Sequence, residues 1–409
     1  MMADAREARA SRMATVLIIG LFFLWGLANN LNDVLVAHFR SVFRLSDFQS
    51  GLVQSAFYLG YFCFAIPAAL ASERFGYKRA VIGGLLLFAA GALLFWPASV
   101  LSSYPFFLLG LFVIASGLAF LETAANPMVM VLGPAAGAER RLNLAQSFNP
   151  LGSITGVGLG AMLILSNSAS AVSEARSVQL PYLAIAGVVL IWAALLAMTR
   201  LPDAAVVPTV HAPGEQGATL AGFAALLRRP RFLAGVAAQF FYVGAQVGIW
   251  SYLIRYVDAA LPLVGEQRAA GLLTLSLALF MAGRFAGTAL LARVGGARLM
   301  AAFALVNVAL TGFAAIGGGG AGVAALVLSS FFMSIMYPTI FVLSLRGLGP
   351  LTKPGASMIV MAIIGGAVVT AVMGLVSDLS GAIRWAMLVP AVCFLVVGGF
   401  ARLHRADRP

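Results

Sequence analysis

Long apolar stretches separated by short polar connections fill most of the chain. A helix that crosses roughly 30 Å of hydrocarbon needs about 20 apolar residues. Twelve stretches meet this requirement: 15–37, 48–71, 80–98, 104–132, 142–165, 179–199, 232–256, 269–292, 299–317, 321–345, 355–377 and 384–403. Short segments of alternating apolar and polar residues, which are typical of membrane β-barrels, are not found. The pattern therefore predicts an all-α membrane protein with twelve transmembrane helices.

Composition supports this interpretation. Of the 409 residues, 61% are hydrophobic and only 10% are Asp, Glu, Lys or Arg, against about 25% charged residues in an average soluble domain. The mean hydropathy is +0.98. A soluble protein needs a polar surface that this sequence cannot supply, so cytosolic enzymes, secreted domains and disordered proteins are excluded. Cys63 and Cys393 lie in apolar runs, which predicts no disulfide framework.

The basic residues predict the orientation in the membrane. If the N-terminus is cytoplasmic, 19 of the 26 lysines and arginines fall in cytoplasmic segments and five in outer segments. Because cytoplasmic loops carry the excess of Lys and Arg, both termini are expected inside. The net charge of +12 then follows from topology, and no basic face is left over for nucleic acid. The first span has no small-residue cleavage site after it, so we expect it to stay in the membrane.

The longest connection, 202–230, divides six spans from six and carries three prolines. It predicts five parts, which are an N-terminal tail, a first six-helix bundle, a cytoplasmic linker, a second bundle and a C-terminal tail. Their bounds are 1–14, 15–201, 202–230, 231–403 and 404–409.

Weak internal similarity links the two halves. Phe22 to Gly26 matches Phe240 to Gly244, the loop 74–79 matches 293–298, and Asn126-Pro127 matches Tyr337-Pro338. The matches keep one order and offsets of 211 to 219 residues. A same-direction repeat of six spans is the arrangement of the major facilitator superfamily, with two pseudo-symmetric six-helix bundles.

The loop between the second and third spans reads SERFGYKR at 72–79 and resembles the acidic-Arg-x-Gly-x-basic-basic loop motif of that superfamily. An acidic side chain can pair with helix N-termini and with neighbouring arginines. Glu73, Arg74 and Arg79 are therefore predicted to form a latch that holds one conformational state. The alternative is a plain charged turn set by the positive-inside rule.

Only two of the 14 acidic residues, Asp33 and Glu122, lie within apolar spans. A charge near the bilayer centre costs roughly 2.5–3.5 kcal/mol, so such a residue is a functional candidate. Burial disfavours the charged form of a carboxyl, which suits it to carry a proton. An internal salt bridge is the structural alternative, but the first half has no Lys or Arg in mid-span. A Na⁺ site is also open, although it would need several oxygen ligands.

Amide side chains lie on faces near these acids. Trp25 and Asn30 precede Asp33 in the first span, Asn126 is one turn from Glu122 in the fourth, and Gln146 and Asn149 share a stripe in the fifth. Amides both donate and accept hydrogen bonds, as a polyhydroxylated ligand requires. These residues are predicted to line a polar cavity. The alternative is that they join helices to one another.

The second half lacks these acids and amides but offers aromatic residues. Tyr242, Gln246 and Trp250 share a face of the seventh span, and Tyr337 lies in the tenth. Aromatic faces can stack on the C–H side of a sugar, although ordinary packing explains such residues equally well. Arg284 in the eighth span is predicted to be structural, pairing with backbone carbonyls or a neighbouring helix.

No catalytic or metal-binding pattern is present. The three histidines, His38, His211 and His404, fall at a span end, in the linker and in the tail, and there is no HExxH, Cys cluster or Gly-x-Ser-x-Gly. We therefore expect that the protein is not an enzyme and that it has no metal site and no cofactor. Protons are the expected coupling ion.

Six segments resemble the bacterial L-fucose–proton symporter family, the fucose permeases. They are FFLWGLANNLND at 22–33, FLETAANP at 120–127, RLNLAQSFN at 141–149, YVGAQ at 242–246, WSYLIRY at 250–256 and MSIMYPTIF at 333–341. The resemblance covers nearly the whole chain apart from the termini and the linker. It implies proton-coupled uptake of L-fucose or a related sugar by alternating access, in the bacterial inner membrane and by a monomer.

On the matching positions the resemblance implies a protonatable pair, Asp33 and Glu122, with Asn30, Gln146 and Asn149 as sugar or cavity contacts. Met336 and Pro150 depart from the family pattern, in which Gln and Ser are expected, and this leaves the preferred sugar open. Glucose, galactose and amino sugars are alternatives. A proton-coupled drug exporter is a further alternative, but its cavity should be mostly aromatic and apolar.

Overall fold

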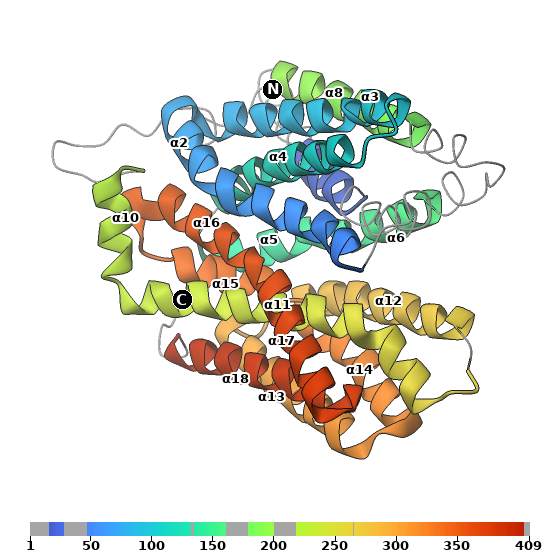
Figure 1. The fold of residues 1–409 in the computed structure, drawn as a ribbon. Helices are drawn as coiled ribbons and strands as arrows, with labels where there is room; N and C mark the ends of the chain where they lie inside the picture. The colour runs from blue at the N-terminus through green and yellow to red at the C-terminus, as the bar shows by residue number, and fades with distance from the viewer. Residues whose placement is uncertain are drawn as a thin grey trace, which may run out of the picture. The chain divides into compact units, whose positions relative to one another are not determined.

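The computed structural model describes residues 16–27, 47–131, 135–160, 179–199, 218–264 and 266–404, and every regular element in these ranges is a helix (Figure 1). Nine helices within them are long and apolar enough to cross a membrane. One of the nine, Ala56–Val100, covers both the second and third predicted spans. The first predicted span begins as a shorter apolar helix, Val16–Leu27.

The first half of the sequence contributes the following helices after Val16–Leu27. They are α2 (Asp47–Leu93), α3 (Phe95–Val100), α4 (Tyr104–Val131), the 3-10 turn η1 (Ala135–Gly137), α5 (Ala138–Gln146), α6 (Phe148–Gly160) and α8 (Gln179–Met198). A further helix, α10 (Leu220–Leu227), lies inside the segment 202–230, for which the sequence predicted only a linker.

The second half contributes the remaining helices. They are α11 (Pro230–Ala260), α12 (Glu266–Leu290), α13 (Gly296–Gly317), α14 (Gly319–Met333), α15 (Met336–Leu345), η3 (Gly349–Leu351), α16 (Thr352–Met361), η4 (Ala362–Ile364), α17 (Gly365–Ser380), η5 (Ile383–Met387) and α18 (Leu388–Leu403).

Helix α2 joins two predicted spans through a sharp break at Gly76. This residue has φ 80° and ψ 164°, outside the helical region. A side chain with a Cβ is disfavoured at positive φ, whereas glycine adopts it at no steric cost. Gly76 lies in the SERFGYKR loop, so the glycine of the motif is the point at which the chain reverses between the two spans.

Three predicted spans are broken helices. The fifth span is α5 followed by α6, the tenth is α14 followed by α15, and the eleventh is α16, η4 and α17. Pro150, Pro338 and Pro354 each lie in the first turn of a helix that follows a break or a loop. Proline is tolerated there because the first-turn amides have no intrahelical acceptor.

The chain forms two compact units. The first comprises Met1–Pro134, Phe148–Phe223 and Pro350–Met361, and the second comprises Ala135–Ser147, Ala224–Gly349 and Ala362–Pro409. Helix α5 of the first sequence half therefore belongs to the second unit, and α16 of the second half belongs to the first. The division into bundles 15–201 and 231–403 follows the helix order and stays a prediction.

In the first unit, α2 packs along α4, and both α8 and α16 pack on α2. In the second unit, α13 packs on α14 and α18, and α11 packs on α17 and α18 (Figure 1). The cores consist of alanine, leucine and phenylalanine side chains, with Phe22, Phe88 and Phe107 in the first unit and Phe341 and Phe394 in the second among the largest that are fully buried.

Candidate functional site

In the first unit a chain of hydrogen bonds leads to Glu122. The indole Nε1 of Trp25 donates to the hydroxyl of Tyr61 over 3.2 Å, and this hydroxyl donates to Glu122 Oε1 over 3.4 Å. All three side chains are buried, and Glu122 is only 5% exposed. The carboxyl thus contacts a neutral donor that can serve it in either protonation state.

Two further polar side chains of α4 lie beside Glu122 in sequence. Thr123 and Asn126 are each fully buried. Asn126 is one helical turn from Glu122, so both side chains lie on the same face of α4. This face therefore carries a carboxyl and an amide within an otherwise apolar helix, as the sequence predicted.

Asp33 and Asn30, the other members of the predicted polar group in the first span, lie outside the described residues. The part of the first helix that is described packs closely on α6. A Cβ built on Gly26 would collide with the carbonyl oxygen of Asn149, and one on Gly152 would collide with that of Phe23. The backbones of the two helices therefore touch, and the half-buried Asn149 sits at this crossing.

In the second unit the buried cation is Arg284 of α12, which is 4% exposed. Its Nε donates to the carbonyl of Ser334 over 2.8 Å, and its Nη1 donates to both the carbonyl and the side-chain oxygen of Gln146 over 3.1 Å. The guanidinium also lies over the ring of Phe280, with Cζ 4.7 Å from its centroid. These contacts fit the structural role predicted for Arg284.

The same contacts bear on Gln146, which was predicted to line the cavity. Its side-chain oxygen accepts a hydrogen bond from Arg284, and the residue is buried. The structure groups Gln146 with the second unit, whereas Asn149 belongs to the first. The stripe predicted from Gln146 to Asn149 is therefore divided between the units at the break after α5.

The aromatic residues predicted to contact a sugar in the second unit differ in how deeply they are buried. Tyr242 is fully buried and donates its hydroxyl to the Met333 carbonyl over 3.0 Å. Tyr337 is half-buried, with its ring centroid 6.4 Å from that of Tyr242. Trp250, also half-buried, donates Nε1 to Ser330 Oγ over 3.1 Å. In this conformation Tyr242 is a packing residue, while Tyr337 and Trp250 retain exposed ring surface.

Helix α11 carries two further glutamines, for which no hydrogen bond like that between Gln146 and Arg284 is described. Gln246 is half-buried. Gln239, two turns earlier, is fully buried, and neither of its amide atoms has a hydrogen-bond partner among the described residues. Because an unpaired buried amide is costly, this helix face carries polar groups that apolar packing alone does not account for.

The predicted latch residues contact the first unit. Glu73 Oε2 accepts a hydrogen bond of 2.5 Å from the backbone N–H of Ala218, two residues before α10. Arg74 and Arg79 are exposed. The cation that reaches the motif is instead Lys353 of α16, which is buried, donates Nζ to the Ser72 carbonyl over 2.8 Å and lies over the ring of Tyr77.

Burial acts on the ionisable groups of this loop region. It raises the pKa of Tyr77 above its ordinary value, and the charge of Glu73 raises it further. It lowers the pKa of Lys353, against the opposing effect of Glu73. The lysine is held in a partly dry environment in which its positive charge is balanced by a carboxylate, a carbonyl and an aromatic face.

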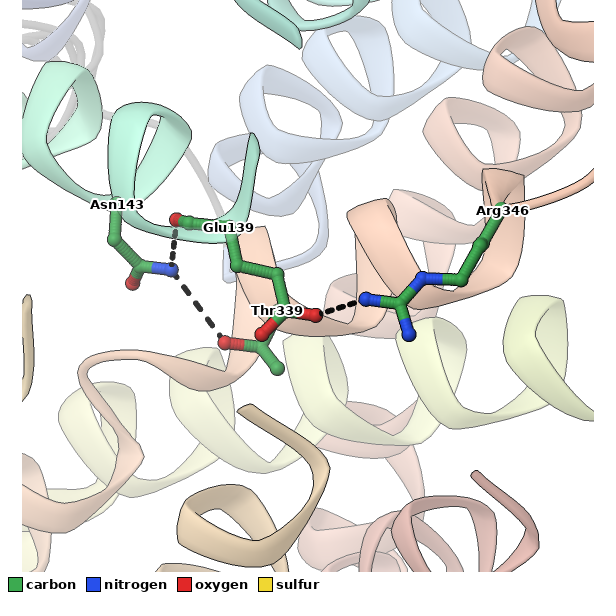
Figure 2. A network of polar contacts seen from close by, with 4 residues as sticks. All are labelled: Glu139, Asn143, Thr339 and Arg346. Carbon is green, nitrogen blue, oxygen red and sulfur yellow. Dashed lines mark hydrogen bonds and ion pairs between the residues drawn. The ribbon is translucent and has the colours of Figure 1, made fainter. Parts of the chain in front are cut away.

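A second polar network joins α5 to α15 in the second unit (Figure 2). Arg346 Nη2 forms an ion pair with Glu139 Oε1 over 2.6 Å. One turn along α5, Asn143 donates to the carbonyl of Glu139 over 2.9 Å and to Thr339 Oγ1 over 3.5 Å. Burial raises the pKa of Glu139 and the charge of Arg346 opposes this rise. The sequence did not predict this network.

Sequence reasoning also missed Tyr61 and Lys353. Tyr61 lies in an apolar span, and no spacing in the sequence relates it to Glu122, so only folding brings its hydroxyl to this carboxyl. Lys353 follows the tenth span and was counted only as a positive-inside residue. In the described part of the chain, no group of three or more His, Cys, Asp or Glu side chains could hold a metal ion.

Comparisons with known proteins agree with this arrangement. The family model described as Major Facilitator Superfamily matches residues 16–361. The chain is 47% identical to the L-fucose-proton symporter of Escherichia coli K12, over 98% of this chain and 95% of that protein. It is 35% identical to a glucose/galactose transporter of Brucella abortus strain 9-941, over 92% and 90% of the two chains.

A solved structure is similar over the same length. The crystal structure of the major facilitator transporter FucP in the outward conformation matches with a TM-score of 0.88 and 46% identity, covering 96% of this chain and 99% of that one. The match confirms the predicted all-α fold and agrees with twelve transmembrane helices. The chain is thus a multi-pass membrane transporter rather than an enzyme, and it belongs to the Major Facilitator Superfamily.

Proposed function

We propose that the protein is a proton-coupled sugar symporter that imports L-fucose or a related monosaccharide by alternating access. The observation that carries the proposal is a buried carboxyl, Glu122, which accepts a hydrogen bond from the Tyr61 hydroxyl, in a chain 47% identical to an L-fucose-proton symporter. A carboxyl in such a place is costly when charged and is relieved by a proton.

Glu122 and Asp33 are the proposed proton carriers. Taking up a proton from the outer side neutralises the carboxyl and removes the cost of closing it into a drier cavity. Tyr61 can donate to the charged carboxylate and accept from the protonated acid, so the contact persists through the cycle. Release of the proton to a more alkaline cytoplasm then resets the carrier.

Sugar hydroxyls would be bound by amides and the sugar's apolar face by aromatic rings. The proposed polar contacts are Asn30, Asn126, Gln146, Asn149 and Gln246, and the proposed aromatic contacts are Trp25, Trp250, Tyr242 and Tyr337. Each hydrogen bond nets only about 0.5–1.5 kcal/mol, so several are needed for useful affinity. Tyr242 would have to become exposed in another conformation, because it is fully buried here.

We further propose a bacterial inner-membrane location, both termini in the cytoplasm and a monomeric carrier. This orientation places the SERFGYKR loop and the Glu139–Arg346 pair on the cytoplasmic side, where the basic residues gather. The proton then enters down the membrane potential, which supplies roughly 2.3 kcal/mol per charge for each 100 mV. That is enough to accumulate a neutral sugar many-fold.

The specificity stays open between 6-deoxy sugars and hexoses. The relative from Brucella abortus is a glucose/galactose transporter, at 35% identity. Met336, fully buried next to Tyr337, and Pro150, buried next to Asn149, are the positions at which the chain departs from the expected fucose permease pattern. Replacement of an amide by a thioether at 336 removes a hydrogen-bonding group, which would alter the choice of sugar.

The test is transport by the purified protein in proteoliposomes. With an inward proton gradient, L-fucose should accumulate above equilibrium, and adding it without a gradient should alkalinise the medium. Parallel assays with D-glucose, D-galactose and N-acetylglucosamine would establish the substrate, and a Na⁺ gradient would test the alternative ion. Uptake of sugar that stays at equilibrium under a proton gradient, or proton influx driven by lipophilic drugs instead, would contradict the proposal.

A further inference from the structure

A basic cavity lies at one end of the second unit, apart from the buried charges described above. It has a volume of about 420 Å³ and forms where the α10–α11 turn, the end of α15 and the end of α18 meet. Its polar lining comes from Arg228, Arg229, Arg231, Ser344, Arg346 and His404. All of these lining residues are in the second unit, and α18 packs along α11.

Most of the positive charge of this cavity has no acidic partner among the described residues. Within the described residues, Arg228, Arg229 and Arg231 are exposed and have no ion-pair partner. Arg346 forms an ion pair with Glu139, and its side chain keeps 43% of its surface exposed. Four arginines therefore line the cavity, and one of them has a carboxylate partner among the described residues.

A buried hydroxyl in the cavity lining also awaits a partner. Ser344 is 4% exposed, and its Oγ has no hydrogen-bond partner among the described residues. Buried polar groups in native structures are almost always hydrogen-bonded, and an exception indicates a missing ligand or water. An oxygen-rich anion in the cavity would satisfy this donor.

The first turn of α11 adds a third feature that favours an anion. This helix has 31 residues and begins at Pro230, and its N-cap residue Arg229 makes no side-chain capping hydrogen bond. The N-terminus of a long helix carries a partial positive charge and presents free N–H groups. Phosphate groups are the ligands commonly found at such ends.

Two exposed leucines are sequence neighbours of cavity residues. Leu227 precedes Arg228 and is 58% exposed, and Leu403 precedes His404 and is 52% exposed. Arginines beside exposed leucines at the end of membrane-spanning helices are suited to the boundary between lipid headgroups and acyl chains. A soluble phosphate would make no use of these leucines, whereas a phospholipid would contact both groups.

We propose that this cavity binds the phosphate group of an anionic phospholipid, with the acyl chains lying over Leu227 and Leu403. The arginines supply charge-assisted hydrogen bonds to the phosphate oxygens, Ser344 donates its hydroxyl, and the start of α11 contributes its dipole. The lipid would fasten the α10–α11 turn to the ends of α15 and α18. The proposal does not depend on which sugar the protein carries or on its coupling ion.

The experiment measures binding of phosphatidylglycerol to the full-length protein in detergent, by native mass spectrometry and by thermal stabilisation, with phosphatidylcholine as the reference lipid. The test variant combines Arg228→Gln, Arg229→Gln and Arg231→Gln. The control combines Arg140→Gln, Arg293→Gln and Arg298→Gln, three exposed arginines outside the cavity. Because a basic residue near a lipid surface contributes about fivefold in affinity, we expect the test variant to bind at least about tenfold more weakly than the control.

A second variant distinguishes specific binding in the cavity from non-specific attraction of an anionic lipid to basic residues. Ser344→Ala leaves every charge in place, so it should weaken phosphatidylglycerol binding severalfold without changing the effect of phosphatidylcholine. Equal losses in the two arginine variants, together with no effect of Ser344→Ala, would overturn the proposal. Glycerol 3-phosphate or inorganic phosphate that stabilises the protein as fully as the lipid, and competes with it, would overturn the assignment to a lipid.

Discussion

Each compact unit buries an ionisable side chain within a long apolar helix, and the partners of the two side chains differ. In the first unit Glu122 accepts a hydrogen bond of 3.4 Å from the Tyr61 hydroxyl. In the second, Arg284 makes bonds of 2.8 to 3.1 Å to Ser334 and Gln146 and lies over an aromatic ring. The carboxyl can become neutral, whereas the guanidinium remains charged at any physiological pH.

The difference suggests a division of labour between the units. A hydroxyl is a neutral partner that can hydrogen-bond to a carboxyl in both of its protonation states. A permanent charge, by contrast, is stabilised by oxygens that hold it in one position. We therefore expect proton coupling to depend on Glu122 in the first unit and stability to depend on Arg284 in the second. Four predictions test this difference.

The largest expected effect is that of Glu122→Gln on coupling. Glutamine keeps the size of the side chain and a contact to Tyr61, but it cannot carry a proton. Accumulation of sugar against its gradient should be abolished, while exchange of sugar at equilibrium and thermal stability should persist. Proteoliposome uptake with and without a proton gradient measures this, with Asp258→Asn as a control acid. Normal uphill uptake by Glu122→Gln would remove the assigned role.

The next effect is on stability. Arg284→Met should remove the hydrogen bonds that Arg284 donates to the carbonyl of Ser334 and to the side-chain oxygen of Gln146, at a cost of about 1–3 kcal/mol for buried groups that lose a hydrogen bond. Thermal unfolding in detergent should show a lower Tm, and this decrease should be clearly larger than the change in Tm caused by Glu122→Gln. If the variant kept its Tm but lost proton coupling, Arg284 would take part in coupling. The proposed difference in role between Glu122 and Arg284 would then be wrong.

The units also differ in how they hold the short helices that come from the other half of the sequence. In the first unit, α16 is attached through buried Lys353, which contacts Ser72 and Tyr77. In the second, α5 is attached through hydrogen bonds from buried Arg284 to Gln146 and also through the Glu139–Arg346 ion pair (Figure 2). A buried single cation and a partly solvated ion pair should respond to substitution by different amounts.

Lys353→Met should lower the free energy of unfolding by about 1–2 kcal/mol, because the Ser72 carbonyl loses its charged donor. The matched control is Arg79→Gln, which alters an exposed cation of the same loop region and should leave the Tm nearly unchanged. Equal Tm values for both variants and the unaltered protein would show that the contact contributes nothing to stability.

The smallest effect is expected for Glu139→Gln. A partly exposed ion pair contributes about 0–1 kcal/mol. Burial raises the pKa of Glu139 in the folded protein, so its charged form is the less favoured one there. The folded state then binds the proton more tightly than the unfolded state does. The resulting stabilisation is present below the ordinary carboxyl pKa and is lost as pH rises through the higher folded value.

Because protonated Glu resembles Gln, the two proteins should be nearly equal in stability near pH 4, and the unaltered protein should lose stability relative to Glu139→Gln as the pH is raised to about 7. Unfolding midpoints measured across this range provide the check. A gain in stability of the unaltered protein as the pH rises would instead mean that Arg346 dominates the environment of Glu139 and lowers its pKa.

The internal repeat predicted from sequence can be compared at one further point. In the first unit Gly152 of α6 touches the backbone at Phe23, and in the second Gly365 of α17 touches the backbone at Phe240. The sequence matched Phe22-Phe23 with Phe240-Phe241 at an offset of 218 residues, and Gly365 follows Gly152 by 213 residues. The same close helix crossing therefore occurs in both halves, where only glycine leaves room for it.

The sequence by itself determined the fold class and the spans. Apolar runs must be long enough to cross a bilayer and must satisfy their backbone groups within helices, and these constraints are local. Glu122 and Arg284 could likewise be selected from the sequence alone, because a charged residue inside an apolar run can be recognised without a structure. The linker was less predictable, since the eight-residue helix α10 is too short to give a clear pattern.

Only the tertiary structure decided which groups meet. Tyr61 lies 61 positions from Glu122, Gln146 lies 138 from Arg284 and Lys353 lies 281 from Ser72. No periodicity links residues this far apart, because the pairing depends on how whole helices pack. Packing also separated Gln146 from Asn149, assigning neighbours in one predicted stripe to different units. The sequence specifies which side chains must find partners in the membrane, and the packing of the helices selects the partners.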